Sequence, residues 1–398
     1  MMTKDAPSTH PPLPPTTEAE RLSCLRLLRS RRVGATTFHR LMQEHGSAAA
    51  ALDALPSIAA AAGVENYTIC PEGVALAEYR AGRAAGAQLL CWGDAAYPEE
   101  ISDLSDAPPL LWAMGDPALL ARPMVALVGA RNASSLGTRM ARKLAGDLSD
   151  LGYVVVSGLA RGVDTAAHLA SLQGGTVAVQ AGGVDVMYPA ENTRLAEDIL
   201  ANGGLRLSEM PMGLQPQARH FPARNRIISG LVRAVVVVEA AARSGSLITA
   251  RCALDQGREV LAVPGHPFDA RAGGCNMLIR DGATLVRSAE DIVEALPQID
   301  AAPKQAELDL QPVAQKTQQQ ASRPTRAQPA DKPKPKRSLK QIAALHQLIL
   351  DRLGPSPVAE DQLIRDLGAP AQSVAPVLID LELDGKVRRQ PGGLLSRG

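Results

Sequence analysis

The chain has 398 residues, with 42 Lys and Arg against 41 Asp and Glu and a formal net charge of +1. This length predicts two or three domains with an ample core. Because the charges balance, net charge does not indicate a nucleic-acid partner, and any such site must come from local clusters of Arg and Lys. The five cysteines show no CxxC spacing and no histidine cluster. They predict reduced thiols in a cytoplasmic protein and argue against a metal site.

The N-terminal part divides into a tail and a helical module. Residues 1–18 are rich in Pro and Thr and lack an apolar stretch, which predicts a disordered tail without a signal sequence. Residues 19–90 place apolar side chains at helical spacing, as in Leu22–Leu28. They predict a small module of the SAM or helix-hairpin-helix (HhH) type. Its turn, Arg31–Gly34, has one glycine where a phosphate-gripping hairpin usually has two, so we favour a packing role over independent DNA reading.

Residues 91–300 alternate short apolar runs with helical patterns. The runs, rich in β-branched residues, are 124–128, 153–156, 176–179, 205–207, 235–238, 260–263 and 284–286. Helical patterns such as Arg139–Leu151 and Leu247–Gln256 separate them. Because strands that are apolar throughout are covered on both faces, the pattern predicts an α/β fold with a Rossmann-like open, mostly parallel sheet. The longest apolar run, Ala234–Ala242, is interrupted by Glu239 and is too short to span a membrane.

The C-terminal part predicts a linker and a winged helix. Residues 301–340 are rich in Gln and Pro and lack aromatic residues, which predicts a disordered linker with a solvated basic end. Residues 341–398 predict helices at 342–353, 358–367 and 374–383, then a wing from Val387 to Leu395. The third helix and its end contain Asp380, Glu382 and Asp384 but no Arg or Lys, unlike a helix that reads the major groove. We expect a protein-contact or packing role for this domain, and its remaining nucleic-acid candidates are Lys386, Arg388 and Arg389 in the wing.

The loops after the strands carry the candidate site, because ligands of open parallel sheets bind at the C-terminal strand ends. The first strand ends in Gly129-Ala130-Arg131. A dinucleotide site needs glycine at the position of Arg131, where an arginine instead offers a forked donor to phosphate.

The second strand leads into Ser157-Gly158 and Arg161-Gly162. Two glycines favour a nest of backbone N–H groups that binds anions, with Arg161 projecting from it. Asp164 and His168 follow, and we interpret them as a helix cap and a packed, hydrogen-bonded histidine rather than a catalytic pair.

The most informative segment is 219–230, interpreted as a loop in which basic side chains surround Phe221. Single-strand binders combine a cationic track for the backbone with flat rings on which bases stack. Arg224 and Arg226, with Asn225 between them, are therefore predicted to hold adjacent phosphates beside the ring of Phe221. The alternative is a core Phe221 next to a solvated helix start. After the fifth strand, Ser244-Gly245-Ser246 opens a helix and suits phosphate.

Together these motifs resemble the DprA/Smf family (DNA processing protein A) over roughly residues 90–295, in segments 129–131, 157–168, 221–230 and 244–250. The resemblance implies a homodimer that binds single-stranded DNA (ssDNA) with little sequence specificity and helps load a RecA-type recombinase during natural transformation. It implies no catalytic residue, metal or cofactor. The implied nucleic-acid-binding residues are Gly129, Arg131, Ser157, Gly158, Arg161, Gly162, Phe221, Arg224, Asn225, Arg226, Ser244, Gly245 and Ser246.

Two other functions remain open. Nucleoside-monophosphate N-glycosidases have a similar fold, with a Pro-Gly-Gly-x-Gly-Thr-x-x-Glu turn that ends in a catalytic carboxylate. The corresponding turn here, Ser244–Thr249, is followed by Ala250–Ala253 without a carboxylate. A nucleotide-binding protein or N-glycosidase is therefore the alternative to a DNA-binding protein. A scaffold that acts only through its winged helix is the other possibility, and the convergent basic loops disfavour it.

Overall fold

The computed structural model describes residues 14–296 and, near the C-terminus, positions 358, 359, 363, 378, 381, 387–390 and 394–397. The chain forms two units, residues 1–306 and 307–398. The predicted linker at 301–340 and most of the predicted tail at 1–18 lie outside the described residues. No helix in the described parts of the chain has the length and apolar character to cross a bilayer.

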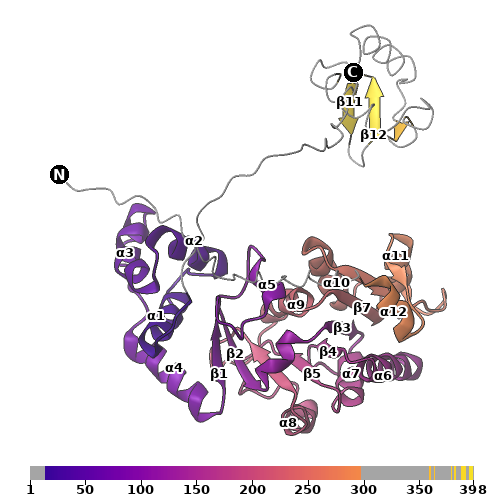
Figure 1. The fold of residues 1–398 in the computed structure, drawn as a ribbon, viewed down its shortest axis with the longest axis horizontal. Helices are drawn as coiled ribbons and strands as arrows, with labels where there is room; N and C mark the ends of the chain where they lie inside the picture. The colour runs from indigo at the N-terminus through magenta and orange to yellow at the C-terminus, as the bar shows by residue number, and fades with distance from the viewer. Residues whose placement is uncertain are drawn as a thin grey trace, which may run out of the picture. The chain divides into compact units, whose positions relative to one another are not determined.

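Four helices form the N-terminal module: α1 (Glu18–Leu28), α2 (Ala35–His45), α3 (Ala48–Ala61) and α4 (Glu72–Ala84). A capping box begins α1, because Thr17 accepts the Glu20 N–H while the Glu20 carboxylate accepts the Thr17 N–H. The module packs beside the β1 edge of the sheet (Figure 1). Its core, which includes Leu25 and Phe38, also contains Trp112 and Val184 from the sheet domain. The module and the sheet therefore share one apolar core.

The sheet has nine strands in the order β1-β2-β6-β5-β4-β3-β7-β8-β9. Their bounds are β1 Gln88–Cys91, β2 Leu110–Gly115, β3 Met124–Gly129, β4 Val154–Ser157, β5 Thr176–Val179, β6 Leu205–Ser208, β7 Ala234–Glu239, β8 Glu259–Ala262 and β9 Thr284–Leu285. Strands β3 to β9 are parallel, which confirms the mostly parallel sheet. The antiparallel strands β1 and β2 were not predicted, and β1 crosses the expected domain boundary between residues 90 and 91.

Helices cover both faces of the sheet, as expected for consecutive apolar strands. They are α5 Glu99–Ser102, α6 Ser135–Asp150, α7 Val163–Ala170, α8 Thr193–Ala201, α9 His220–Gly230, α10 Ser246–Asp255, α11 Gly273–Arg280 and α12 Ala289–Ala295, with 3-10 turns at Pro117–Ala121 and Ala190–Asn192. On one face Ala126 and Val128 pack with α9 and α10, and on the other Val125 and Leu127 pack with α6 and α7. The strand order reverses between β3 and β7, which places the expected ligand site there.

In the C-terminal unit, β10 (Val358–Ala359), β11 (Val387–Gln390) and β12 (Leu394–Arg397) form a sheet in the order β10-β12-β11. The β11–β12 hairpin is the predicted wing. Strand β10 corrects the prediction of a helix from residue 358, because Val358 and Ala359 pair with Leu395 and Leu394. Leu363, Leu378 and Leu381 are helical and buried, so the periodic leucines of the predicted helices form a core.

Candidate nucleic-acid interface

A pocket of about 1200 Å³ opens at the carboxyl ends of β3 and β7. Its walls are the turn after β3, the loop before α9 with one face of that helix, and the turn that begins α10. Of the predicted residues, this pocket is lined by Gly129, Arg131, Phe221, Arg224, Asn225, Ser244, Gly245 and Ser246. Residues far apart in the sequence thus meet at the reversal of strand order.

The charges around this pocket are mostly positive. Arg131, Arg224, Arg243 and Arg271 contribute cations, and Asp164 is the one acid among the described lining residues. Arg243 and Arg271 were not predicted: Arg243 directly precedes the segment 244–250, and Arg271 lies outside all four segments. A concave site with this excess of guanidinium groups attracts anions and can bind phosphate in a forked geometry.

A second pocket of about 350 Å³ adjoins the first and shares Arg131, Phe221 and Arg224 with it. Gly158 and Arg161, both predicted, line this second pocket. The exposed guanidinium of Arg161 lies 3.6 Å from the exposed carboxylate of Glu191. An acid therefore stands beside one of the predicted phosphate contacts.

Two aromatic rings lie between the pockets. Tyr188 and Phe221 have ring centroids 5.9 Å apart, and the Arg131 guanidinium lies over the Phe221 ring at 4.9 Å. Tyr188 is 47% exposed and was missed by sequence reasoning. It follows β5, so the rule that selected the other loops would have found it. Paired rings beside arginines are suited to stacking with unpaired bases.

Residues 220–230 form helix α9, which corrects the prediction of a loop. Pro222 occupies the first turn, where proline is tolerated. Phe221, Arg224 and Ile228 share one face and line the pocket. Because a helix turns 100° per residue, Arg226 points away from Arg224. It pairs instead with Glu209 and donates to the Asp106 carbonyl oxygen at 2.6 Å, so the structure does not bring Arg226 to the pocket.

Arg224 lies at the floor of the pocket and is 5% exposed. Its Nη1 donates to the carbonyl oxygens of Gly158 and Val179, both at 2.6 Å. Gly158 permits this contact, because a Cβ there would lie 2.3 Å from Arg224 Nη1. Burial lowers the pKa of the Arg224 guanidinium to about 10, and the nearby Asp164 carboxylate opposes the shift. The buried side chain therefore remains charged at neutral pH.

Hydrogen bonds from Ser157 and to Asp164 stabilise the turn after β4. Ser157 Oγ donates to the Leu127 carbonyl oxygen at 2.7 Å. Asp164 Oδ2 accepts the N–H groups of Gly158 and Ala160 at 3.1 and 3.3 Å. The predicted cap is therefore wrong: Asp164 lies inside α7, and Gly162 is the N-cap residue. The expected N–H nest is therefore partly filled by the protein's own carboxylate, because Asp164 accepts two of its N–H groups.

Gly162 has a backbone φ of +80°, and a Cβ there would lie 2.2 Å from the Ala130 carbonyl oxygen. Glycine is therefore required for the β4–α7 turn to approach the turn after β3. Neither Ser157 nor Gly162 lines either of these two pockets; both instead fix the shape of the turn that forms a pocket wall.

His168 is fully buried, and its Nδ1 lies 2.7 Å from Thr176 Oγ1. Its Nε2 has no hydrogen-bond partner among the residues that the structure describes, so the predicted hydrogen-bonded histidine is correct for one nitrogen only. Burial lowers the His168 pKa to about 3. This ring is neutral at physiological pH.

The turn at Ser244–Ser246 begins α10, a helix of ten residues. Ser244 Oγ and Ser246 Oγ lie 2.8 Å apart, and Gly245 is the N-cap residue. This helix N-terminus opens toward the pocket with two hydroxyl groups, an arrangement that suits an anion. Within the described residues, no cluster of three His, Cys, Asp or Glu side chains could hold a metal ion.

Family models match the helical module, the sheet domain and the C-terminal unit. The model of the family "DNA recombination-mediator protein A" matches residues 88–297. Models of the DprA-like N-terminal HHH domain and the DprA winged helix domain match residues 18–81 and 328–393. Of the two types expected for the helical module, the HhH type is thereby identified.

Individual proteins of known family that resemble this chain belong to the same family. DNA processing protein DprA of Streptococcus pneumoniae is 49% identical over 202 residues, which are 50% of this chain and 71% of that protein. Protein Smf of Escherichia coli is 37% identical over 299 residues, which are 75% of this chain and 74% of that protein. The X-ray structure of the Streptococcus pneumoniae DprA matches with a TM-score of 0.56 and 37% identity, over 71% of this chain and 98% of that one. The chain belongs to the DprA/Smf family of DNA recombination-mediator proteins.

Proposed function

We propose that this protein binds ssDNA with little sequence specificity in the two adjoining pockets. The observation that carries the proposal is the grouping of four arginines and two aromatic rings at the reversal of strand order. Arg131 and Arg161 contact phosphates, and Arg224 adds positive charge from the pocket floor. The turn Ser244–Ser246 donates its N–H and hydroxyl groups.

Bases stack on Phe221 and Tyr188 in this proposal. Each stacked base contributes roughly 1–3 kcal/mol, and the contact is tolerant of sequence because every base has a flat face. The polar groups of the larger pocket include four arginines and the turn Ser244–Ser246, and guanidinium and backbone N–H groups contact the sugar–phosphate backbone rather than base edges. Binding with little sequence preference follows.

The proposal extends to the biological role. Membership in a family of recombination mediators supports a protein that helps load a RecA-type recombinase on ssDNA during natural transformation. We also propose a homodimer, which the family resemblance implies, acting in the cytoplasm, where free cysteines stay reduced. The winged helix serves protein contacts, because its predicted recognition helix lacks Arg and Lys. Loading is tested by the rate of RecA assembly on ssDNA with and without this protein.

Fluorescence anisotropy with a labelled oligonucleotide, single-stranded or duplex, tests the binding site. We expect ssDNA to bind more tightly than duplex, with an affinity that falls by about 0.7 log units per phosphate contact for each tenfold rise in salt. Arg131→Ala removes an exposed pocket arginine and should weaken binding and lower this slope. Arg139→Ala, an exposed arginine on α6 outside both DNA pockets, is the matched control.

Binding that ignores strandedness and Arg131→Ala would contradict the proposal. Saturable hydrolysis of a nucleoside monophosphate would support the N-glycosidase alternative instead.

A further inference from the structure

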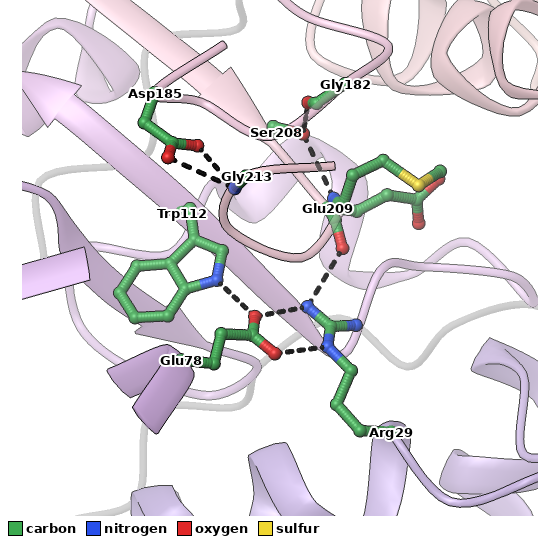
Figure 2. Close-up of polar contacts among 9 residues, drawn as sticks. Arg29, Glu78, Trp112, Gly182, Asp185, Ser208, Glu209 and Gly213 are labelled. Carbon is green, nitrogen blue, oxygen red and sulfur yellow. Dashed lines mark hydrogen bonds and ion pairs between the residues drawn. The ribbon is translucent and has the colours of Figure 1, made fainter. Parts of the chain in front are cut away.

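A chain of polar contacts runs from the helical module to the sheet domain (Figure 2). Arg29, at the end of α1, donates to both carboxylate oxygens of Glu78 on α4, each at 2.9 Å. Trp112 of β2 donates its indole N–H to the same carboxylate at 2.9 Å. Both charged side chains are largely buried. The bidentate pair is therefore a fixed structural element rather than a surface ion pair.

Glu209 is the next link, in the segment after β6. Its carbonyl oxygen accepts a long hydrogen bond of 3.5 Å from Arg29 Nη2, as Figure 2 shows. Its carboxylate pairs with Arg226 of α9, and both side chains are 15% exposed. Burial raises the pKa of Glu209, and the Arg226 guanidinium opposes the shift. Glu209 thus contacts the helical module through its backbone and α9 through its side chain.

Arg226 holds α9 in place through contacts with two residues, Glu209 and Asp106. Besides Glu209, it donates to the Asp106 carbonyl oxygen at 2.6 Å and lies 3.5 Å from the Asp106 carboxylate. The opposite face of α9 presents Phe221 and Arg224 to the pockets. A rotation or shift of this helix would therefore move both pocket side chains together.

Apolar contacts follow the same route. Val184 and Met212, from the segments after β5 and β6, pack against the core of the helical module. The two segments are joined by Asp185, whose carboxylate accepts the Gly213 N–H at 2.9 Å. Further along them, Tyr188 and Pro216 line the pockets. The helical module therefore supports two pocket walls as well as α9.

We propose that Glu209 and Arg226 are positioning residues for the ssDNA site, and that the helical module tunes DNA affinity through them without touching DNA. This inference rests on the proposed function and adds a role to a domain that contributes no pocket residue. It also assigns Arg226 a task other than phosphate contact.

Salt dependence of ssDNA binding distinguishes the two roles of Arg226. If Arg226 positions α9, Arg226→Ala weakens binding by ~3- to 30-fold at every salt concentration, because a coupling network of this kind transmits such effects. The slope of log Kd against log salt then stays that of the wild type. A phosphate contact would instead lower the slope by about 0.7. Arg194→Ala, with a side chain 92% exposed on α8, is the control and should change neither quantity.

The sign of the Glu209→Gln effect is a second test. Removing the carboxylate loosens α9 in the positioning account and weakens binding. If Arg226 were available to DNA, freeing it from Glu209 would tighten binding. Glu78→Gln, one link further from the pockets, is measured in parallel in case Glu209→Gln fails to fold, and it should weaken binding with an unchanged slope. Thermal unfolding of each variant confirms that the folded protein is compared.

The inference alone is overturned if Glu209→Gln binds ssDNA as tightly as the wild type or more tightly. Glu78→Gln decides in the same way if Glu209→Gln does not fold. A lowered salt slope in Arg226→Ala also overturns the inference. Absence of ssDNA binding by the wild-type protein overturns the proposed function itself. The two failures are therefore distinguishable in one set of titrations.

Discussion

Replacing Arg224 by alanine should destabilise the whole domain. Its guanidinium makes two hydrogen bonds of 2.6 Å to buried carbonyl oxygens, and each hydrogen bond to a charged group contributes about 1.5–3 kcal/mol. Its removal also leaves the buried Asp164 carboxylate without its positive neighbour, although burial already raises the pKa of that acid. We expect Arg224→Ala to cost about 3–5 kcal/mol of unfolding free energy, because both of these hydrogen bonds are lost.

Urea unfolding followed by tryptophan fluorescence measures this loss. A cost of this size lowers the Tm by roughly 6–20 °C in a domain of this length. Arg131→Ala is the matched control, because Arg131 is exposed, contacts only the Phe221 ring through its charge and has no ion-pair partner among the described residues; its free energy of unfolding should stay within about 1 kcal/mol of the wild type. A loss below about 1 kcal/mol for Arg224→Ala would refute the reasoning. Loss of DNA binding in Arg224→Ala therefore needs a stability control that Arg131→Ala does not.

Three further outcomes follow from the site. Glu191→Gln removes the acid beside Arg161 and should tighten ssDNA binding by no more than about fivefold at low salt; anisotropy that shows weaker binding would contradict this. Gly162→Ala places a Cβ against the Ala130 carbonyl oxygen at positive φ and should cost about 2 kcal/mol or more, whereas Gly152→Ala, also at positive φ but in open space, should cost less in the same thermal unfolding assay. Burial lowers the His168 pKa from 6.5 to about 3, so protons bind the unfolded state preferentially as pH falls below 6.5. Wild-type stability should drop by about 2 kcal/mol between pH 7 and pH 5 from this group; an equal drop in His168→Gln would refute the assignment.

The parallel part of the sheet could be predicted from sequence because each buried strand is apolar throughout and ends in a polar loop. Strand β2 (Leu110–Gly115) has the same local character, but its antiparallel pairing with β6 joins residues nearly a hundred positions apart. Local patterns do not encode such a partner. Strand β10 was missed for the same reason, since pairing with β12 overrides a helical spacing of leucines.

The candidate site shows how a wrong local structure misplaces a side chain. In an extended segment, Arg224 and Arg226 would point the same way, because side chains repeat every two residues. In the helix α9 they point in different directions, and only Arg224 reaches the pocket. The segment was interpreted as one of the loops that follow the strands, although Phe221, Arg224 and Ile228 already had helical spacing.

Two contacts in the candidate site could not be predicted from any local sequence pattern. The pairing of Tyr188 with Phe221 depends on how the loop after β5 folds over α9. The filling of the N–H groups of Gly158 and Ala160 by Asp164 depends on a tight turn whose geometry the motif alone does not specify.

The location of bound ssDNA tests the central claim most directly. A single-stranded oligonucleotide that carries 5-iodouracil is cross-linked to the protein by ultraviolet light, and the attached peptides are identified by mass spectrometry. We predict adducts on the peptides that contain Tyr188 and Phe221, and their loss in Arg131→Ala. Adducts confined to residues 301–398, with the peptides of the two pockets unmodified, would contradict the assignment of ssDNA binding to this site.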